Sequence, residues 1–136
     1  MANVLLSKLV RPVLRVTEIV VLWSACHGLV FAQQDAVTHF NKAVEFYRTG
    51  KYDDAISEFQ ASSKLSPTDP LIPNWIGFVL LRQGKNEAAI PLLQQAVTLR
   101  SNYTEAWTNL GNAFLGANKV DDAISAFKKT TELDPK

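Results

Sequence analysis

The sequence predicts an all-α protein, a solenoid of three helix-turn-helix repeats with six helices in total. The segment Asp-Asp-Ala-Ile-Ser at residues 53–57 recurs letter for letter at residues 121–125, an offset of twice 34 positions. Gly50, Gly84 and Asn118 follow one another at intervals of 34 positions. Glycine and asparagine most easily adopt the left-handed conformation that ends a helix. A single helical hairpin cannot bury both of its faces, so we expect the three repeats to stack.

Residues 1–32 have the pattern of a secretory signal peptide. Lys8, Arg11 and Arg15 precede an apolar stretch over positions 19–32, and polar residues follow it at once. The stretch ends in Ala32, a small residue of the kind that a signal peptidase accepts. It is too short for a membrane-spanning helix, which needs about 20 apolar residues. We therefore expect cleavage after Ala32 and export of the mature chain, either to the periplasm or out of the cell.

Three other interpretations of this segment stay open. Residues 23–26, Trp-Ser-Ala-Cys, resemble a lipoprotein box, although more apolar sequence follows the cysteine. An uncleaved anchor is an alternative if the weakly apolar residues 4–16 join the stretch. Because the positive charges come first, such an anchor would leave the rest of the chain outside the cytoplasm. A mitochondrial presequence would fit the arginines but not the continuous apolar run. Membrane association is expected only if the segment stays uncleaved.

Each repeat is expected to contain two helices. In the third repeat, Trp107, Leu110, Gly111 and Phe114 have the i, i+3, i+4, i+7 spacing of one helix face. A turn at Asn118 stops this helix, and two aspartates then favour the start of a second helix, because carboxylates stabilise the positive end of the helix dipole. The 34-residue grid places the repeats at residues 36–69, 70–103 and 104–136.

This pattern resembles the tetratricopeptide repeat, whose motif is Trp-x-x-Leu-Gly-x-x-Tyr, then Ala-x-x-x-Phe, then Pro. The third repeat matches the motif, with Phe in place of Tyr, at Trp107, Leu110, Gly111, Phe114, Ala123, Phe127 and Pro135. The first repeat departs from it with His39 and Lys42 in the Trp and Leu places. The second has Pro73 in the Trp place and Trp75 two residues on. The resemblance covers residues 36–136 and implies a right-handed superhelical solenoid.

Composition speaks against several other functions. Fourteen basic and thirteen acidic residues give a net charge of +1, so there is no electrostatic footprint for nucleic acid. One cysteine and two histidines leave little material for a metal site or a catalytic dyad. The acidic pairs at residues 53–54 and 121–122 recur at helix starts, which explains them without catalysis. We therefore expect no enzyme activity, no cofactor and no metal ion.

The resemblance implies that the first helix of each repeat lines a concave groove, and it assigns the residues that face this groove. We expect the partner-binding residues to be Phe40, Val44, Tyr47, Arg48, Asn74, Phe78, Leu81, Arg82, Thr108 and Asn112. Family members that grip an acidic C-terminal peptide carry Lys and Asn where Phe40 and Val44 stand here, so we do not expect that grip. The expected ligand is an amphipathic helix or an extended segment of another protein. The competing interpretation is that several of these apolar residues pack between helices and leave the groove inert.

The last helix offers a second candidate surface. Arrays of this kind usually finish with a solvating helix, and this sequence ends at Lys136 without one. Ile124 and Phe127 would then be partly exposed, and exposed apolar patches mark interaction sites. Either copies of the chain associate there, or another protein docks, or the natural protein is longer. The sequence thus predicts an exported scaffold or adaptor that binds another protein; the alternatives are a self-assembling structural subunit and an accessory domain of an envelope-processing enzyme.

Overall fold

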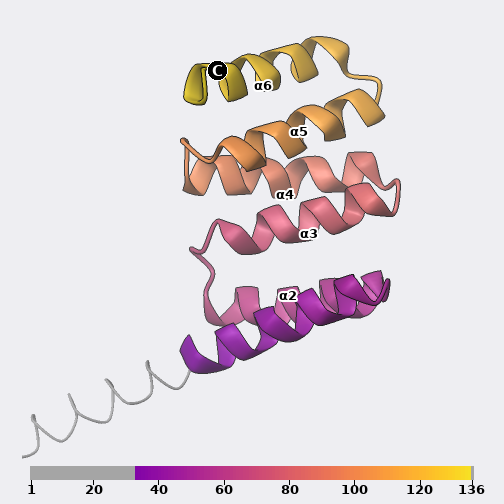
Figure 1. Cartoon of the computed structure of the whole chain (residues 1–136), viewed down its shortest axis with the longest axis vertical. Helices are drawn as coiled ribbons and strands as arrows, with labels where there is room; N and C mark the ends of the chain where they lie inside the picture. The colour runs from indigo at the N-terminus through magenta and orange to yellow at the C-terminus, as the bar shows by residue number, and fades with distance from the viewer. Residues whose placement is uncertain (1–32, 136) are drawn as a thin grey trace, which may run out of the picture. The chain divides into compact units, whose positions relative to one another are not determined.

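The computed structural model describes residues 33–135, and the predicted signal peptide at residues 1–32 lies outside this part of the chain. A helix runs over residues 33–48, and five more follow: α2 (Tyr52–Leu65), α3 (Leu71–Arg82), α4 (Asn86–Leu99), α5 (Thr104–Gly116) and α6 (Val120–Leu133). The helices stack in chain order, with α6 at one end of the stack (Figure 1). The described part contains no strand, which confirms the predicted all-α solenoid of six helices.

The turns inside the three repeats are built alike. Gly50, Gly84 and Asn118 have positive φ angles of 75°, 73° and 59°, as the sequence predicts. After each of them, a lysine donates its backbone N–H to a carbonyl five residues earlier, at 2.9 Å, 2.9 Å and 2.8 Å in turn. This hydrogen bond satisfies a carbonyl that the end of a helix otherwise leaves without a partner. The second helices α2 and α6 then begin with aspartates in their first turns, as expected.

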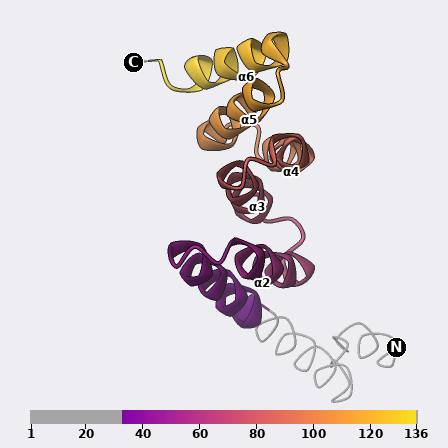
Figure 2. The same cartoon turned by 90° about the vertical axis from the view of Figure 1, so that its right-hand side faces the viewer.

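Small residues let the two helices of a repeat approach each other closely. Ala55, Ala89 and Ala123, which occupy the same place in successive repeats, are all fully buried. Gly77 of α3 lies so close to α4 that a Cβ atom there would overlap the side chain of Leu93. The two helices of this repeat lie side by side in Figure 2. Tight hairpins of this kind leave the remaining apolar side chains to join one repeat to the next.

The first repeat replaces an apolar contact with charged ones. His39 and Lys42, which stand in the Trp and Leu places of the motif, both reach Glu58 of α2 at 2.6 Å. The hydrogen bonds from His39 and Lys42 lower the pKa of Glu58. These side chains are partly exposed, so the contacts can form without complete desolvation of the charges. No helix among residues 33–135 is long and apolar enough to cross a membrane.

Candidate functional site

The predicted groove residues lie on the 33–48 helix, α3 and α5, which are the first helices of successive repeats. We call this surface the first-helix face. Three of the predicted residues are exposed: Arg48, Arg82 and Asn112. Six are half-buried: Phe40, Val44, Tyr47, Phe78, Leu81 and Thr108. Asn74 is buried.

Trp75 of α3 lies at the centre of a cluster of aromatic rings. Its ring centroid is 5.7 Å from that of Phe59 in a stacked arrangement, and 5.8 Å and 5.9 Å from those of Tyr47 and Phe78. Phe40 meets Trp75 edge-to-face at 6.2 Å. Ring pairs at such spacings are favourable beyond their buried area. The five rings, which we call the aromatic cluster, join the first repeat to the second.

The aromatic cluster changes the interpretation of three predicted groove residues. Phe40, Tyr47 and Phe78 place part of their surface against other rings, so they form the floor of the first-helix face rather than freely projecting side chains. In sequence, Trp75 is visible only as a residue two places away from the motif position. The central member of the cluster is therefore a residue that neither the motif nor the predicted groove assigns.

Asn74 occupies a different environment from the one that the sequence predicts. It is only 1% exposed, and its side-chain N–H group donates to the Tyr103 hydroxyl at 3.0 Å, with Glu105 at 3.4 Å. Its side-chain oxygen accepts a hydrogen bond of 3.0 Å from Asn109 of α5. Buried polar groups need such partners, because an unpaired group loses its hydration without compensation. Asn74 thus joins α3 to α5 and does not present its amide to a ligand.

Two junctions between repeats use the same pair of positions with different chemistry. We call the contact between the first and second repeats junction one, and the contact between the second and third repeats junction two. Phe40 and Trp75 meet at junction one, and Asn74 and Asn109, each one repeat period further on, meet at junction two. Junction one is therefore joined by aromatic rings and junction two by a buried amide hydrogen bond.

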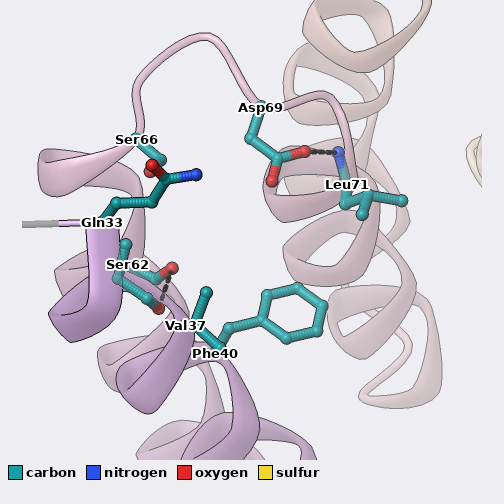
Figure 3. Close-up of a pocket in the computed structure, with 8 residues that line it drawn as sticks. Gln33, Val37, Phe40, Ser62, Ser66, Asp69 and Leu71 are labelled. Atoms are coloured by element: carbon teal, nitrogen blue, oxygen red, sulfur yellow. Dashed lines mark hydrogen bonds between the residues drawn. The ribbon is translucent and has the colours of Figure 1, made fainter. Parts of the chain in front are cut away.

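A cavity of about 200 Å³ opens at junction one. Val37, Phe40 and Leu71 contribute apolar walls, and Ser66, Asp69 and Gln33 contribute polar atoms around them. Figure 3 shows the Asp69 carboxylate hanging from the loop between α2 and α3, with the Phe40 ring across the opening from it. One oxygen of Asp69 accepts a hydrogen bond of 2.9 Å from the backbone N–H of Leu71, which fixes the carboxylate in place.

The two residues predicted to form an exposed surface on the last helix differ in their exposure. Ile124 is 61% exposed, whereas Ile90, the equivalent residue of the preceding repeat on α4, is 7% exposed beneath the third repeat. Phe127 is half-buried, because the absence of a side chain at Gly111 leaves room for its ring against α5. Val120, one turn before Ile124, is also exposed. Ile124 and Val120 thus define the exposed apolar surface of α6, which we call the α6 face.

The described part of the chain shows no group of three or more His, Cys, Asp or Glu side chains that could hold a metal ion. The expectations that the protein is not an enzyme and uses no cofactor stay predictions.

Stacked helical hairpins with a continuous face of first helices define the class of helical-repeat solenoids. Within this class, two family models match the chain: one described as "Tetratricopeptide repeat" over residues 76–136, and one described as "TPR repeat" over residues 43–84. Together they cover residues 43–136, so the chain carries tetratricopeptide repeats over this range.

The curated relatives that match this chain are several times longer than it is. Mouse RNA polymerase II-associated protein 3 is 28% identical over 108 residues, which are 79% of this chain and 16% of that protein. Mouse DnaJ homolog subfamily C member 3 is 29% identical over 101 residues, which are 74% of this chain and 20% of that protein. The chain thus spans a fifth or less of the length of these relatives.

Solved structures with the same fold include the first TPR domain of Spaghetti (RPAP3) bound to the HSP90 peptide SRMEEVD. It is 27% identical, with a TM-score of 0.74, over 76% of this chain and 82% of that one. The crystal structure of MamA is 26% identical, with a TM-score of 0.71, over 74% of this chain and 59% of that one.

Proposed function

We propose that the protein is a non-catalytic scaffold or adaptor that binds a segment of another protein along its first-helix face. The observation that carries this proposal is the exposure of a large apolar side chain on each of the three first helices, namely Val37, Leu71 and Leu115. Apolar side chains gathered on one surface mark interaction sites. Arg48 and Arg82 are exposed near the ends of the first two of these helices and can donate hydrogen bonds to the ligand.

The similarity to Spaghetti (RPAP3), whose domain is bound to an HSP90 peptide, supports a peptide as the class of ligand. We infer that the chemistry of the ligand differs. Phe40 and Val44 stand here at the positions where family members that grip an acidic C-terminal peptide carry Lys and Asn. The segment bound by this chain is therefore expected to be an amphipathic helix or an extended peptide with apolar side chains.

A second candidate function is self-assembly through the α6 face, and the exposure of Ile124 favours it. Among the described residues, the other end of the stack offers no matching apolar surface. The 33–48 helix carries exposed polar residues at the positions where α3 carries Ile72, Trp75, Ile76 and Val79: these are Thr38, Asn41, Lys42 and Glu45. Two copies would therefore pair α6 to α6 rather than stack head to tail, which gives a closed dimer.

Matched pairs of substitutions separate the two functions. In the first pair, Val37→Gln with Leu115→Gln, the replaced side chains on the first-helix face are 48% and 50% exposed. In the second pair, Val120→Gln with Ile124→Gln, the replaced side chains on the α6 face are 51% and 61% exposed. Because all four side chains are about half in solvent or more, both variants are expected to keep their helicity by circular dichroism.

The first pair is expected to abolish capture of partner proteins from the native host, and the second pair to leave capture intact. Affinity purification with mass spectrometry measures this result, and sedimentation of the same proteins measures self-association. Undiminished capture by the first pair would contradict binding along the first-helix face. A monomeric full chain across micromolar concentrations would contradict self-assembly.

We further propose that the protein is exported, to the periplasm or out of the cell. The supporting observation is the order of charged, apolar and small residues over positions 1–32. Intact-mass spectrometry of protein from the native host is expected to show a chain that begins at Gln33. An intact Met1 end would contradict cleavage, and a lipid-modified chain that begins at Cys26 would favour the lipoprotein alternative.

A further inference from the structure

The cavity at junction one combines apolar walls with a carboxylate at its opening. Val37 and Phe40 of the 33–48 helix form one side of the opening, and Asp69 and Leu71 lie across from them. Asp69 is the one charged residue among the described residues that line the cavity. A ligand group that fills this space needs an apolar body to lie along the walls and a positive charge to meet the carboxylate.

Junction two shows what the same positions do when they are filled by the chain itself. Tyr103 is the equivalent of Asp69 in the next repeat, and Asn74 is the equivalent of Phe40. The Tyr103 hydroxyl and the Asn74 side-chain N–H group meet at 3.0 Å, so the longer tyrosine reaches Asn74 beside junction two. At junction one the shorter aspartate faces a ring with which it forms no hydrogen bond, and the cavity lies between them. At junction one, a side chain of a bound ligand can take the bridging place that Tyr103 takes at junction two.

The surroundings of the cavity favour a cation. Glu105 lies next to Asn74 at the start of α5, on the same edge of the first-helix face. Burial raises the pKa of Tyr103, and the carboxylates of Glu105 and Asp69 raise it further, so both carboxylates act on this region. Arg100 stacks on the Tyr103 ring and offsets part of this effect. Acidic residues at helix starts interact favourably with the helix dipole. Asp69 differs from the acidic residues at the starts of α2, α5 and α6 because it also lines an apolar cavity.

We propose that the cavity at junction one anchors a lysine or arginine side chain of the segment that binds to the first-helix face. The aliphatic stem of that side chain lies against Phe40, Val37 and Leu71, and its cationic head pairs with Asp69. Long cationic side chains have this character, an apolar stem with a charged end. The inference rests on the proposed function and deepens it: the ligand is an apolar segment with a lysine or arginine that enters junction one, at the opposite end of the helices from Arg48 and Arg82. This differs from the acidic HSP90 peptide bound by the similar Spaghetti (RPAP3) domain.

Three labelled decapeptides, acetylated and amidated so that their ends carry no charge, test this proposal on the full chain. Each alternates leucine with a second residue, which is lysine, serine or glutamate. Fluorescence anisotropy is expected to show the tightest binding for the lysine peptide and the weakest for the glutamate peptide. The preference for lysine should decrease as salt is added, because ions screen charges that are partly exposed.

The variant Asp69→Asn with Glu105→Gln removes both charges and keeps the shapes of the side chains. The asparagine side-chain oxygen can accept the same hydrogen bond from the Leu71 N–H, so α3 is expected to keep its start. Loss of the partly exposed ion pair with Asp69, together with the nearby charge of Glu105, is expected to weaken binding of the lysine peptide about three- to tenfold, with little change for the serine peptide. The matched control, Asp121→Asn with Asp122→Asn, makes the same change of charge at the start of α6 and should leave binding unchanged.

Two results would overturn the inference: equal binding of the lysine peptide by the Asp69 and Glu105 variant and by the wild type, or binding of the glutamate peptide at least as tight as that of the lysine peptide. The Val37 and Leu115 variant then separates this failure from failure of the proposed function. If that variant loses the serine peptide, the first-helix face binds peptides without a cationic anchor. If it binds all three peptides as the wild type does, both proposals fail.

Discussion

Phe59→Ala is expected to lower the free energy of unfolding by about 3–5 kcal/mol, the range for removal of a fully buried phenylalanine side chain. Phe59 has no exposed surface, stacks on Trp75 at 5.7 Å and meets Phe40 at 5.2 Å. Its loss opens a void between the first two repeats. Since a small domain is stable by only about 5–15 kcal/mol, chemical denaturation followed by circular dichroism should show a large shift of the midpoint.

Phe127→Ala is the matched control, because Phe127 occupies the same position two repeats later. Its ring is half-buried against Gly111 and has no further repeat beyond it among the described residues. Removal of a ring that is partly in solvent is expected to lower the free energy of unfolding by about 1–2 kcal/mol. Equal losses for the two variants would contradict the assignment of Phe59 to the centre of the stack.

Asn74→Leu is expected to lower the free energy of unfolding by about 2–4 kcal/mol, since it leaves two polar groups without partners. The side-chain N–H group of Asn109 loses its acceptor, and the Tyr103 hydroxyl loses its donor. Leucine has a similar size, so lost hydrogen bonds rather than lost volume explain the effect. Chemical denaturation again provides the measurement.

Two further variants test this explanation of the Asn74 effect. Asn112→Leu, on the exposed surface of α5, is expected to change the free energy of unfolding by about 0.5 kcal/mol or less. Asn74→Leu combined with Asn109→Leu should recover part of the loss, because replacement of both hydrogen-bond partners by apolar groups leaves fewer polar atoms unpaired. A double variant less stable than the sum of the single ones would contradict a pairwise hydrogen bond.

The elements of the fold could be predicted from the sequence because they depend on local chemistry. The positive φ angles of Gly50, Gly84 and Asn118 follow from the residue type at the turn. The buried alanines follow from the 34-residue period. The contacts behind these signals lie within one helical hairpin, and recurrence of the hairpin every 34 residues makes them visible in the sequence.

The details of the first-helix face could not be predicted because they depend on pairs of distant residues. The repeat pattern places Asn74 on the groove but does not reveal that Tyr103, at the end of the same repeat, and Asn109, from the next repeat, will bury it. The role of Trp75 depends on three rings from the first repeat. Likewise the sequence places Ile124 and Phe127 on one face of a helix. Only the structure shows that the missing side chain at Gly111 leaves room for the Phe127 ring to turn inward.

The two junctions differ in how they resist bending. A hydrogen bond between Asn74 and Asn109 is directional, so it fixes the angle between α3 and α5 within narrow limits. Contacts between the rings of Phe40 and Trp75 hold over a range of offsets and tilts. At these positions we therefore expect the angle between α3 and α5 to be restricted more narrowly than the angle between the 33–48 helix and α3. A ligand held at junction one would then act on the less restricted of these two angles.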